Sequence, residues 1–454
     1  MPLDLQPLEP GPTGRAPDWA AAVDLYRAAF SRPPYLEAIS AADAEAALTG
    51  LLRRGGEVLL AHDRGEAVAL AGGEQRVPGR YHLAEFAVHP DRQGVGLGRR
   101  LLSALLDHPP VRQAVCVEVW TKADNHAALG LYRAHGFEPD GAATLVPRTD
   151  VAGRSRLHRS VRLTRPGPAT VSPCADPDRL HRVAVTYPSG NATAVVFDQH
   201  RLDEDRATLN RRLIRALADA HPDLPGIEQC CFVTEPFDPR AIARMEMFGG
   251  EFCGNAARSV VRLATRGRPM RGWLEASGVR APLAFEVDAH GVRLHLPLPD
   301  DAEVVRPTSH GVLVGLEGIT HLVVAGDELP GDTARRALLD ELRDVPDGGE
   351  RDPLLDRGAL GVTCWQPDAA QAAFSVWVDE VDTVFDETAC GSGTGAIAVA
   401  LAHQRQAPVE VDVGQPSGRI IRAGAHYADA IGRVAEAWIA GEVEVLSDGE
   451  VMLR

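Results

Sequence analysis

The sequence predicts an α/β domain followed by a larger α+β domain built from two similar lobes. Three observations lead to this fold class. Strand-like and helix-like runs alternate up to about residue 164, and a proline-rich segment follows. Beyond that segment, short strands are interleaved with two helices, each introduced by a glycine motif. A chain of 454 residues is also too long for one ordinary domain, so several cores are expected.

The first domain is expected at residues 1–164. Its strands carry apolar, β-branched runs, and its helices carry apolar residues at helical spacing, the last one ending on Gly136. In chain order we expect three strands, a helix, a strand and a helix, at residues 55–62, 66–74, 81–89, 98–108, 114–120 and 125–136.

A linker is expected at residues 165–180, because RPGPATVSPCADPDR contains four prolines and no apolar periodicity. The second domain then divides into lobes at residues 181–306 and 307–454. The motifs FCGNAA and ACGSGT resemble each other, and an apolar helical run follows each of them. This similarity indicates that the two lobes arose by duplication.

Composition excludes several classes of protein. The chain is 45% hydrophobic and 24% charged, as in soluble globular proteins. It has no apolar run of 18 residues and no signal-like amino terminus, so we expect no membrane association and a cytoplasmic location. A net charge of −16 argues against nucleic-acid binding.

Seven cysteines are an odd number for a disulfide framework, and their spacing does not suit a metal site, so no metal is expected. Five are interpreted as core or incidental residues: Cys116, Cys174, Cys230, Cys231 and Cys364. Cys253 and Cys390 differ because small, glycine-rich sequence surrounds both.

Cys253 and Cys390 suit the inversion of a carbon centre, which needs a base on one face and an acid on the other. A thiolate is the working base, so its pKa must fall from about 8.5 toward the operating pH. A helix N-terminus favours an anion, and each cysteine stands just before an expected helix. Two such motifs, 137 positions apart, therefore predict an acid/base pair.

The segments RMEMFGGEFCGNAARSVVRLA and FDETACGSGTGAIAVALA resemble the two active-site segments of the diaminopimelate epimerase family. YPSGNAT at residues 187–193 and GITH at residues 318–321 are similar to two further segments of that family. The resemblance covers about residues 181–454. It implies two α+β lobes with a free amino acid between them, one cysteine from each lobe, and neither pyridoxal phosphate nor a metal.

The same resemblance implies roles for individual residues. Cys253 and Cys390 would be the catalytic acid and base, and His321 would assist the reacting centre. The α-amino and carboxylate groups of the substrate would be bound by Asn191, Gly254, Asn255, Gly391 and Ser392.

Departures from the family pattern bear on the substrate. Ile319 stands where the family has asparagine, and no arginine precedes Cys390, so nothing obvious is left to hold a distal carboxylate. A monocarboxylic amino acid is favoured, with diaminopimelate itself as the alternative. Glu251, Asp379 and Glu380 would suit a cationic side chain such as that of histidine, ornithine, lysine or arginine, and are equally readable as surface charges.

Glycines between a strand and a helix mark the first domain: VHPDRQGVGLGRRLL at residues 88–102. This string, with NHAALGLYRAHGF at residues 125–137, resembles the GNAT N-acetyltransferases over about residues 15–163. The resemblance implies Tyr132 as the acid for coenzyme A and Glu85 as the base for an accepting amine. Acetyl-CoA would be bound by Val88, Gln93, Gly94, Val95, Gly96, Gly98, Arg99 and Asn125.

Two functions follow for the whole chain. One is a bifunctional metabolic enzyme, an amino-acid racemase or epimerase fused to an acetyl-CoA-dependent acetyltransferase. The other is regulatory: the first domain senses acyl-CoA or acetylates a protein, and the racemase is its output. A homodimer is left open.

Overall fold

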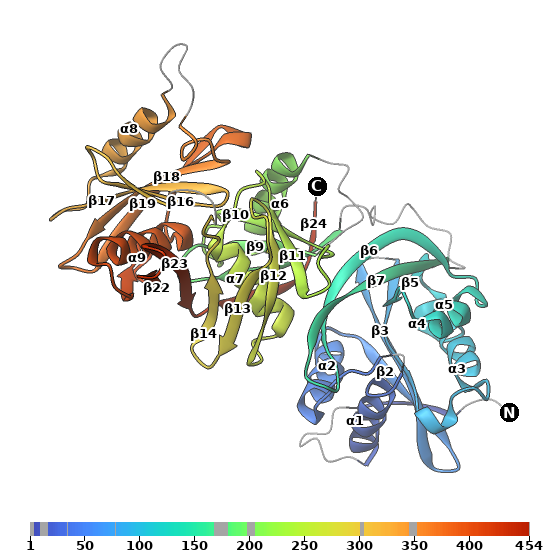
Figure 1. Ribbon diagram of the computed structural model, residues 1–454. Helices are drawn as coiled ribbons and strands as arrows, with labels where there is room; N and C mark the ends of the chain where they lie inside the picture. The colour runs from blue at the N-terminus through green and yellow to red at the C-terminus, as the bar shows by residue number, and fades with distance from the viewer. Residues whose placement is uncertain are drawn as a thin grey trace. The chain divides into compact units, whose positions relative to one another are not determined.

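A computed structural model describes residues 4–9, 17–33, 35–77, 79–167, 180–197, 205–299, 304–344 and 352–453. The chain divides into two compact units, Met1–Arg179 and Leu180–Arg454 (Figure 1). Residues 168–179 of the expected linker lie outside the described residues, and its first two residues end a strand. The exact domain boundaries stay a prediction. No helix in the described ranges is long and apolar enough to cross a membrane.

The amino-terminal unit contains one seven-stranded sheet with the order β1-β2-β3-β4-β5-β7-β6. The strands are β1 (Asp4–Pro7), β2 (Glu57–Asp63), β3 (Glu66–Val77), β4 (Arg80–Val88), β5 (Cys116–Lys122), β6 (Glu138–Thr149) and β7 (Ser155–Pro166). Only β4 and β5 pair in parallel, and their pairing runs from Arg80 with Cys116 to Leu83 with Val119. Glu85 therefore lies beyond the last β4 residue that pairs with β5, although it still pairs with Gly72 of β3.

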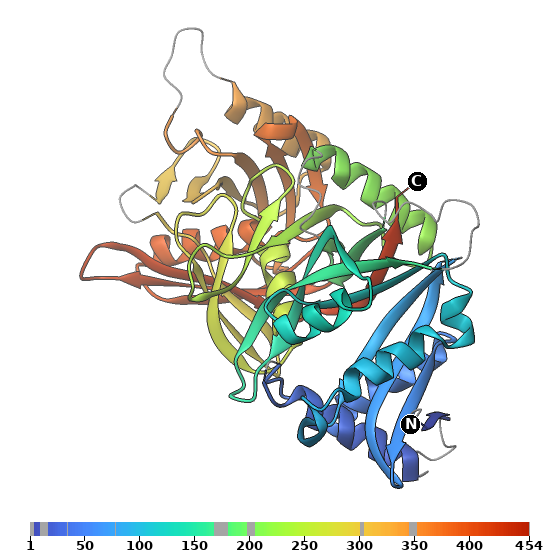
Figure 2. The ribbon, with the colours of Figure 1, turned by 90° about the vertical axis from the view of Figure 1, so that its right-hand side faces the viewer.

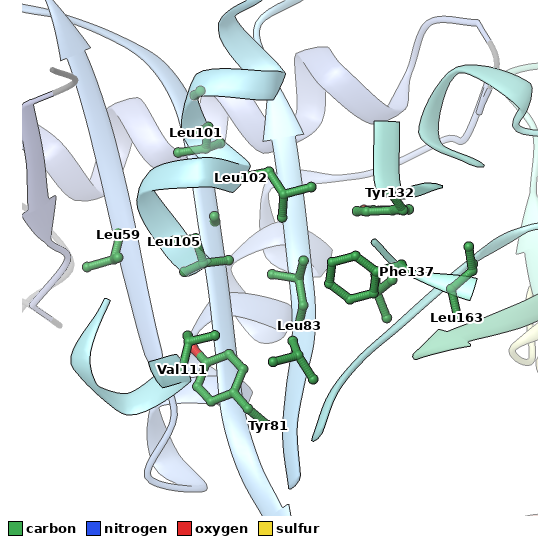
Figure 3. Packing of buried hydrophobic residues seen from close by; sticks show 14 of the residues in the cluster. Leu59, Tyr81, Leu83, Leu101, Leu102, Leu105, Val111, Tyr132, Phe137 and Leu163 are labelled. Carbon is green, nitrogen blue, oxygen red and sulfur yellow. The ribbon is translucent and has the colours of Figure 1, made fainter. Parts of the chain in front are cut away.

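Helices cover both faces of this sheet (Figure 2). Their ranges are α1 (Pro17–Phe30), α2 (Ala41–Arg53), α3 (Leu97–Leu106), α4 (Pro109–Arg112) and α5 (His126–Arg133). Helices α1 and α2 pack on one face and α3 to α5 on the other, where Leu101, Leu102 and Tyr132 meet the strand residue Leu83 (Figure 3). The six elements expected from sequence are all found, but α5 ends at Arg133 rather than at Gly136, which follows it in the left-handed region (φ 80°).

The carboxyl-terminal unit has two groups of strands. The first is β8 (Leu180–Tyr187), β9 (Thr193–Val196), β10 (Gln229–Thr234), β11 (Ala241–Met247), β12 (Met270–Ala276), β13 (Leu283–Asp288) and β14 (Gly291–His295). The second is β15 (Val305–Pro307), β16 (Val312–Leu316), β17 (Ile319–Ala325), β18 (Ala359–Gln366), β19 (Gln371–Val378), β20 (Thr383–Glu387), β21 (Val409–Gly414), β22 (Ile420–Ala428) and β23 (Arg433–Gly441). A last strand, β24 (Glu444–Met452), returns to pair with β8.

Four helices connect these strands: α6 (Arg206–Ala220), α7 (Gly254–Thr265), α8 (Asp332–Arg343) and α9 (Gly391–Arg405). In the first lobe α6 and α7 join the parallel pairs β9–β10 and β11–β12. In the second lobe α8 joins the parallel pair β17–β18, and β20 followed by α9 joins the parallel pair β19–β21. The corresponding last strands, β14 and β23, pair with each other. The expected two similar lobes are thus present, each with one glycine-introduced helix.

Candidate active site

Both singled-out cysteines line one cavity in the carboxyl-terminal unit. Cys253 caps the N-terminus of α7 with backbone angles φ −126° and ψ 112°, and Cys390 caps α9 with φ −126° and ψ 110°. The two loops therefore share one local conformation, as expected for duplicated lobes. The cavity volume is about 40 Å³.

The first turns of α7 and α9 touch each other at this cavity. A Cβ added to Gly391 would lie 3.0 Å from Asn255 Oδ1, and one added to Gly254 would lie 3.7 Å from the Gly391 Cα. Both would also lie 2.8 Å from Ile439 Cδ1. Glycine at both positions thus allows two helix N-termini, with their unpaired N–H groups and positive dipole ends, to face one cavity.

The sulfur atom of each cysteine accepts a hydrogen bond from a neighbouring polar group. Gln229 Nε2 donates to Cys253 Sγ at 3.3 Å, and the Gly393 N–H donates to Cys390 Sγ at 3.3 Å. The Ser392 hydroxyl lies 3.5 Å from the Cys390 sulfur. Gln229 comes from β10 and was not found from the sequence, because a lone glutamine beside two buried cysteines carries no recognisable pattern.

Both thiols have raised pKa values, which differs from the lowered pKa expected from their helix N-termini. Burial raises the pKa of Cys253 to about 12, and the neighbouring Glu387 acts in the same direction. Burial, followed by Glu387, also raises the pKa of Cys390. Desolvation outweighs the N–H groups of the helix, so both thiols are neutral at pH 7 in the substrate-free protein.

His321 lies on β17 behind the cavity rather than in its lining. It is completely buried, and burial lowers its pKa to about 3, so the imidazole is neutral. Its Nε2 shares a hydrogen bond of 2.9 Å with Ser392 Oγ, and its Nδ1 shares one of 3.0 Å with Thr363 Oγ1. His321 therefore reaches Cys390 through Ser392.

All five residues expected to bind the amino-acid backbone line the cavity: Asn191, Gly254, Asn255, Gly391 and Ser392. Asn255 Nδ2 donates to the Ala389 carbonyl at 2.9 Å, which ties α7 to the residue before Cys390. Asn191 Oδ1 accepts from Gln229 Nε2 at 3.0 Å. The structure thus brings the expected residues of both lobes together around one space.

Three carboxylates line the same cavity: Glu228, Glu251 and Glu387. Burial raises the pKa of Glu251 to about 7 and that of Glu387 to about 8, and it also raises the pKa of Glu228. Glu251 is 6% exposed, and its Oε2 has no hydrogen-bond partner in the described parts of the chain. A bound cation would favour the ionised form of each of these carboxyl groups, so the lining suits a positively charged side chain.

Sequence reasoning found only Glu251 of these three. Asp379 and Glu380, which were expected to act with it, lie exposed on a 3-10 turn (Asp379–Val381) and are not among the cavity-lining residues. Glu387 stands three residues before Cys390, at the end of β20, and this adjacency was the available signal. Glu228 is adjacent to Gln229 and had no such marker.

Three of the other five cysteines are core residues, as expected. Cys230 and Cys231 on β10 and Cys364 on β18 are buried, and Cys116 on β5 is partly buried. Cys174 lies outside the described residues.

In the amino-terminal unit the glycine-rich loop joins β4, through a short 3-10 turn (Pro90–Arg92), to α3. Gly94 and Gly96 have φ of 77° and 82°, and a Cβ on either would meet no atom within 4 Å. Val95 is 75% exposed, and Gln93 Nε2 donates to the Val88 carbonyl at 3.1 Å. The loop is thus open at the N-terminus of α3, where a phosphate could approach the backbone.

Gly98 and Arg99 lie in the first turn of α3 beside this loop. Asn125, expected to contact the cofactor, is 3% exposed and caps α5: its Oδ1 accepts from the Ala128 N–H at 3.1 Å. Its Nδ2 donates to the Tyr35 hydroxyl at 2.8 Å. Both the oxygen and the nitrogen of the Asn125 side chain therefore make hydrogen bonds within this unit.

Tyr132 lies on α5 and Glu85 on β4, close enough to interact electrostatically. The ring of Tyr132 packs edge-on against Phe86, with centroids 6.2 Å apart, and burial followed by Tyr35 and Glu85 raises its pKa. Burial also raises the pKa of Glu85 to about 7, although a hydrogen bond from Tyr26 opposes this. A carboxyl with a pKa of about 7 has the proton affinity of a general base at neutral pH.

Known proteins resemble the two units separately. Residues 183–452 match the family model described as the histidine racemase CntK N-terminal domain, and residues 19–137 match the acetyltransferase (GNAT) family. A histidine racemase of Fusobacterium nucleatum subsp. nucleatum is 24% identical over 278 residues, which are 59% of this chain and 95% of that protein.

The matches to the amino-terminal unit are shorter. N-alpha-acetyltransferase RimI of Mycobacterium tuberculosis is 45% identical over 64 residues, which are 14% of this chain and 39% of that relative. The crystal structure of the ribosomal-protein-S18-alanine N-acetyltransferase from Escherichia coli has 23% sequence identity and a TM-score of 0.29, covering 37% of this chain and 97% of that chain.

The racemase model spans more than half of the chain, and the GNAT model lies within the amino-terminal unit. The expectation of a GNAT domain followed by an epimerase-like racemase is thus confirmed at the level of family and fold. The chain is an enzyme with a GNAT acetyltransferase domain, and it belongs to the family of the histidine racemase CntK N-terminal domain.

Proposed function

We propose that the carboxyl-terminal unit inverts the α-carbon of histidine, with Cys253 and Cys390 as the acid/base pair. The observation that carries this proposal is one cavity lined by both cysteines, each at the N-terminus of an equivalent helix, together with three carboxylates. The name of the Fusobacterium relative supports histidine among the cationic amino acids.

The chemistry follows from the geometry around the cavity. One sulfur, as thiolate, takes the α-proton, and the thiol of the other cysteine returns a proton to the opposite face. Negative charge then grows on the substrate carboxylate, and the N–H groups at the starts of α7 and α9 stabilise it. Because each face of the α-carbon has its own sulfur, no single group has to reach both faces.

The carboxylates account for the choice of side chain. Glu251 has an unpartnered, buried oxygen that would accept a hydrogen bond from a protonated imidazole or an ammonium group. Bound positive charge lowers the pKa of nearby carboxyl groups and thiols, so the substrate itself would favour the thiolate. Diaminopimelate would instead bring a second carboxylate toward Glu228, Glu251 and Glu387, where like charges repel.

Independence from pyridoxal phosphate is part of the proposal. That cofactor reacts through a lysine amine, and Lys122, in the amino-terminal unit, is the only lysine of the chain. Arginine cannot replace lysine here, because its guanidinium stays protonated. Removal of the cofactor by hydroxylamine or of metals by a chelator should leave racemisation unchanged.

A panel of L-amino acids in D₂O tests the substrate. We expect deuterium at Cα of histidine, with ornithine, lysine and arginine as the nearest competitors and diaminopimelate unlabelled. Mass spectrometry reads the label, and chiral chromatography reads the inversion. Labelling of diaminopimelate in preference to histidine would contradict the assigned side-chain site.

For the amino-terminal unit we propose that acetyl-CoA binds at the loop from Gln93 to Arg99 and that an amine is acetylated. The open loop, with its glycines at positive φ before α3, supports this. Tyr132 and Glu85 would serve as acid and base. The regulatory alternative predicts that acetyl-CoA changes the rate of racemisation, whereas two independent activities predict no change.

A further inference from the structure

A buried cation lies one helical turn behind the cavity. Arg258 on α7 has no exposed surface and is the largest fully buried side chain in the described chain. Its Nη2 donates to Asn255 Oδ1 at 2.8 Å and to the Pro188 carbonyl at 3.3 Å. A Cβ on Gly441 would lie 2.8 Å from its Nη1, so glycine at the end of β23 makes room for the guanidinium.

This cation lacks a carboxylate partner within the described ranges. Its Nε and Nη1 have no hydrogen-bond acceptor there. A buried charge without a counter-charge is unfavourable, so a nearby anion would stabilise it. Burial lowers the pKa of Arg258 to about 10, and the one ionisable group that opposes this is Cys253. At neutral pH the guanidinium therefore stays charged while the Cys253 thiol is neutral, and the Cys253 thiolate, once formed, would be the anion that balances it.

Arg258 also fixes a residue of the cavity wall. Because Asn255 Oδ1 accepts from Arg258, the amide of Asn255 is oriented with its Nδ2 toward the Ala389 carbonyl. That carbonyl belongs to the residue directly before Cys390. A continuous chain of hydrogen bonds thus leads from the guanidinium to the backbone of the second active-site loop.

We propose that Arg258 is a positioning residue of the racemase, which supplies the buried positive charge opposite the Cys253 thiolate and holds the Asn255 amide in place. This inference rests on the proposed role of Cys253. Besides burial, the carboxylates Glu387 and Glu251 oppose the ionisation of that sulfur, and the Ala256 N–H and Gln229 favour it. Cys231 on β10 interacts with it as a further thiol. Arg258 is the cation whose own pKa is raised by Cys253.

The test is the reactivity of Cys253 in full-length protein without substrate. Alkylation by iodoacetamide reports the thiolate, and peptide mass spectrometry separates Cys253 from Cys390. In Arg258→Met the alkylation rate of Cys253 at pH 7.5 should fall about tenfold, corresponding to a pKa higher by about one unit. The acidic limb of the pH–kcat profile for histidine should move to higher pH by the same amount.

Arg262→Met is the matched control, because Arg262 lies one turn further along α7 and outside the cavity lining. It should leave the alkylation profile unchanged. Arg258→Lys keeps the charge but not the planar fork, so the alkylation profile should stay near that of the wild type while KM rises. If Arg258→Met does not fold, Arg258→Gln replaces it, with the same expected loss of reactivity.

An unchanged alkylation profile in the neutral variant, or an equal loss in Arg258→Lys, would overturn the proposal. These outcomes are distinct from failure of the two-cysteine mechanism. Racemisation that survives Cys253→Ala would refute that mechanism, whereas the reactivity of Cys253 is measured without turnover.

Discussion

At the scale of single residues, the sequence predicted the reacting groups better than their environment. One cavity is lined by Cys253, Cys390 and the five residues expected to bind the α-amino and carboxylate groups of the substrate. These residues could be predicted because they belong to short motifs with a fixed local geometry. Gln229 was missed because its role depends on β10 meeting the first active-site loop in the folded chain, whereas Glu387 was overlooked although it stands three residues before Cys390. Asp379 and Glu380 were expected in the site from their position in the sequence, but they lie on an exposed turn.

Glu251→Gln should weaken the binding of histidine and stabilise the free protein. The pKa of Glu251 is raised from 4.5 to about 7, so the protonated form is favoured by folding. Stability from this group is therefore complete below about pH 4.5 and lost as pH rises through about 7, by on the order of 3 kcal/mol. The neutral amide removes this loss but also removes the charge that binds a cation.

Two measurements check the Glu251 variant. Thermal unfolding at pH 8 should show a higher midpoint than the wild type, and KM for histidine should rise at least about tenfold, as for the loss of one partner of a buried charge pair. Glu380→Gln, exposed on its turn, is the control and should change neither value. A Glu251→Gln enzyme with wild-type KM would place the substrate cation elsewhere.

His321→Asn should lower kcat while leaving the binding of histidine nearly intact. His321 is outside the cavity lining and holds the Ser392 hydroxyl, which lies 3.5 Å from the Cys390 sulfur. Loss of this support should reduce kcat about tenfold or more, as for other residues that orient a catalytic group. Thr320→Ser, one residue earlier on β17, is the control. A rise in KM alone would indicate that His321 acts on substrate binding.

At the scale of elements, strong apolar periodicity made six elements of the amino-terminal unit predictable. Helices α1 and α2 were not predicted, although their buried residues form the core on one face of the sheet. Their runs are rich in alanine and charged residues, so the apolar stripe is weak and packing determines the helix. The pairing of β14 with β23 joins residues 143 to 149 positions apart, from His295 with Trp438 to Val292 with Gly441, and no local pattern can reveal it.

Gly96→Glu should abolish acetyl-CoA binding to the loop before α3. Gly96 has φ 82°, so any side chain is strained there by about 1 kcal/mol, and glutamate adds a negative charge where the pyrophosphate would lie. Gly96→Ala carries the strain without the charge and is the matched control. Calorimetry should show a small loss for alanine and at least about tenfold more for glutamate. Equal affinities for the two variants would place the cofactor away from this loop.

At the scale of the whole molecule, contacts divide the chain into two compact units, and the racemase and GNAT matches fall in different units. Expressed alone, residues 1–179 should fold and bind acetyl-CoA, and residues 180–454 should racemise histidine, because each part contains its own core. Circular dichroism and calorimetry check the first fragment, and chiral chromatography checks the second. A folded second fragment without activity would show that the racemase needs the amino-terminal unit.

The duplicated lobes give the central claim, that each lobe supplies one cysteine to one face of the substrate carbon. The most direct measurement is the interconversion of L- and D-histidine in D₂O by Cys253→Ala and Cys390→Ala, with Cys364→Ala, buried on β18, as the control. Each active-site variant should lose inversion by about 10²–10⁴-fold, while the control keeps it. Wild-type inversion in either Cys253→Ala or Cys390→Ala would contradict the account.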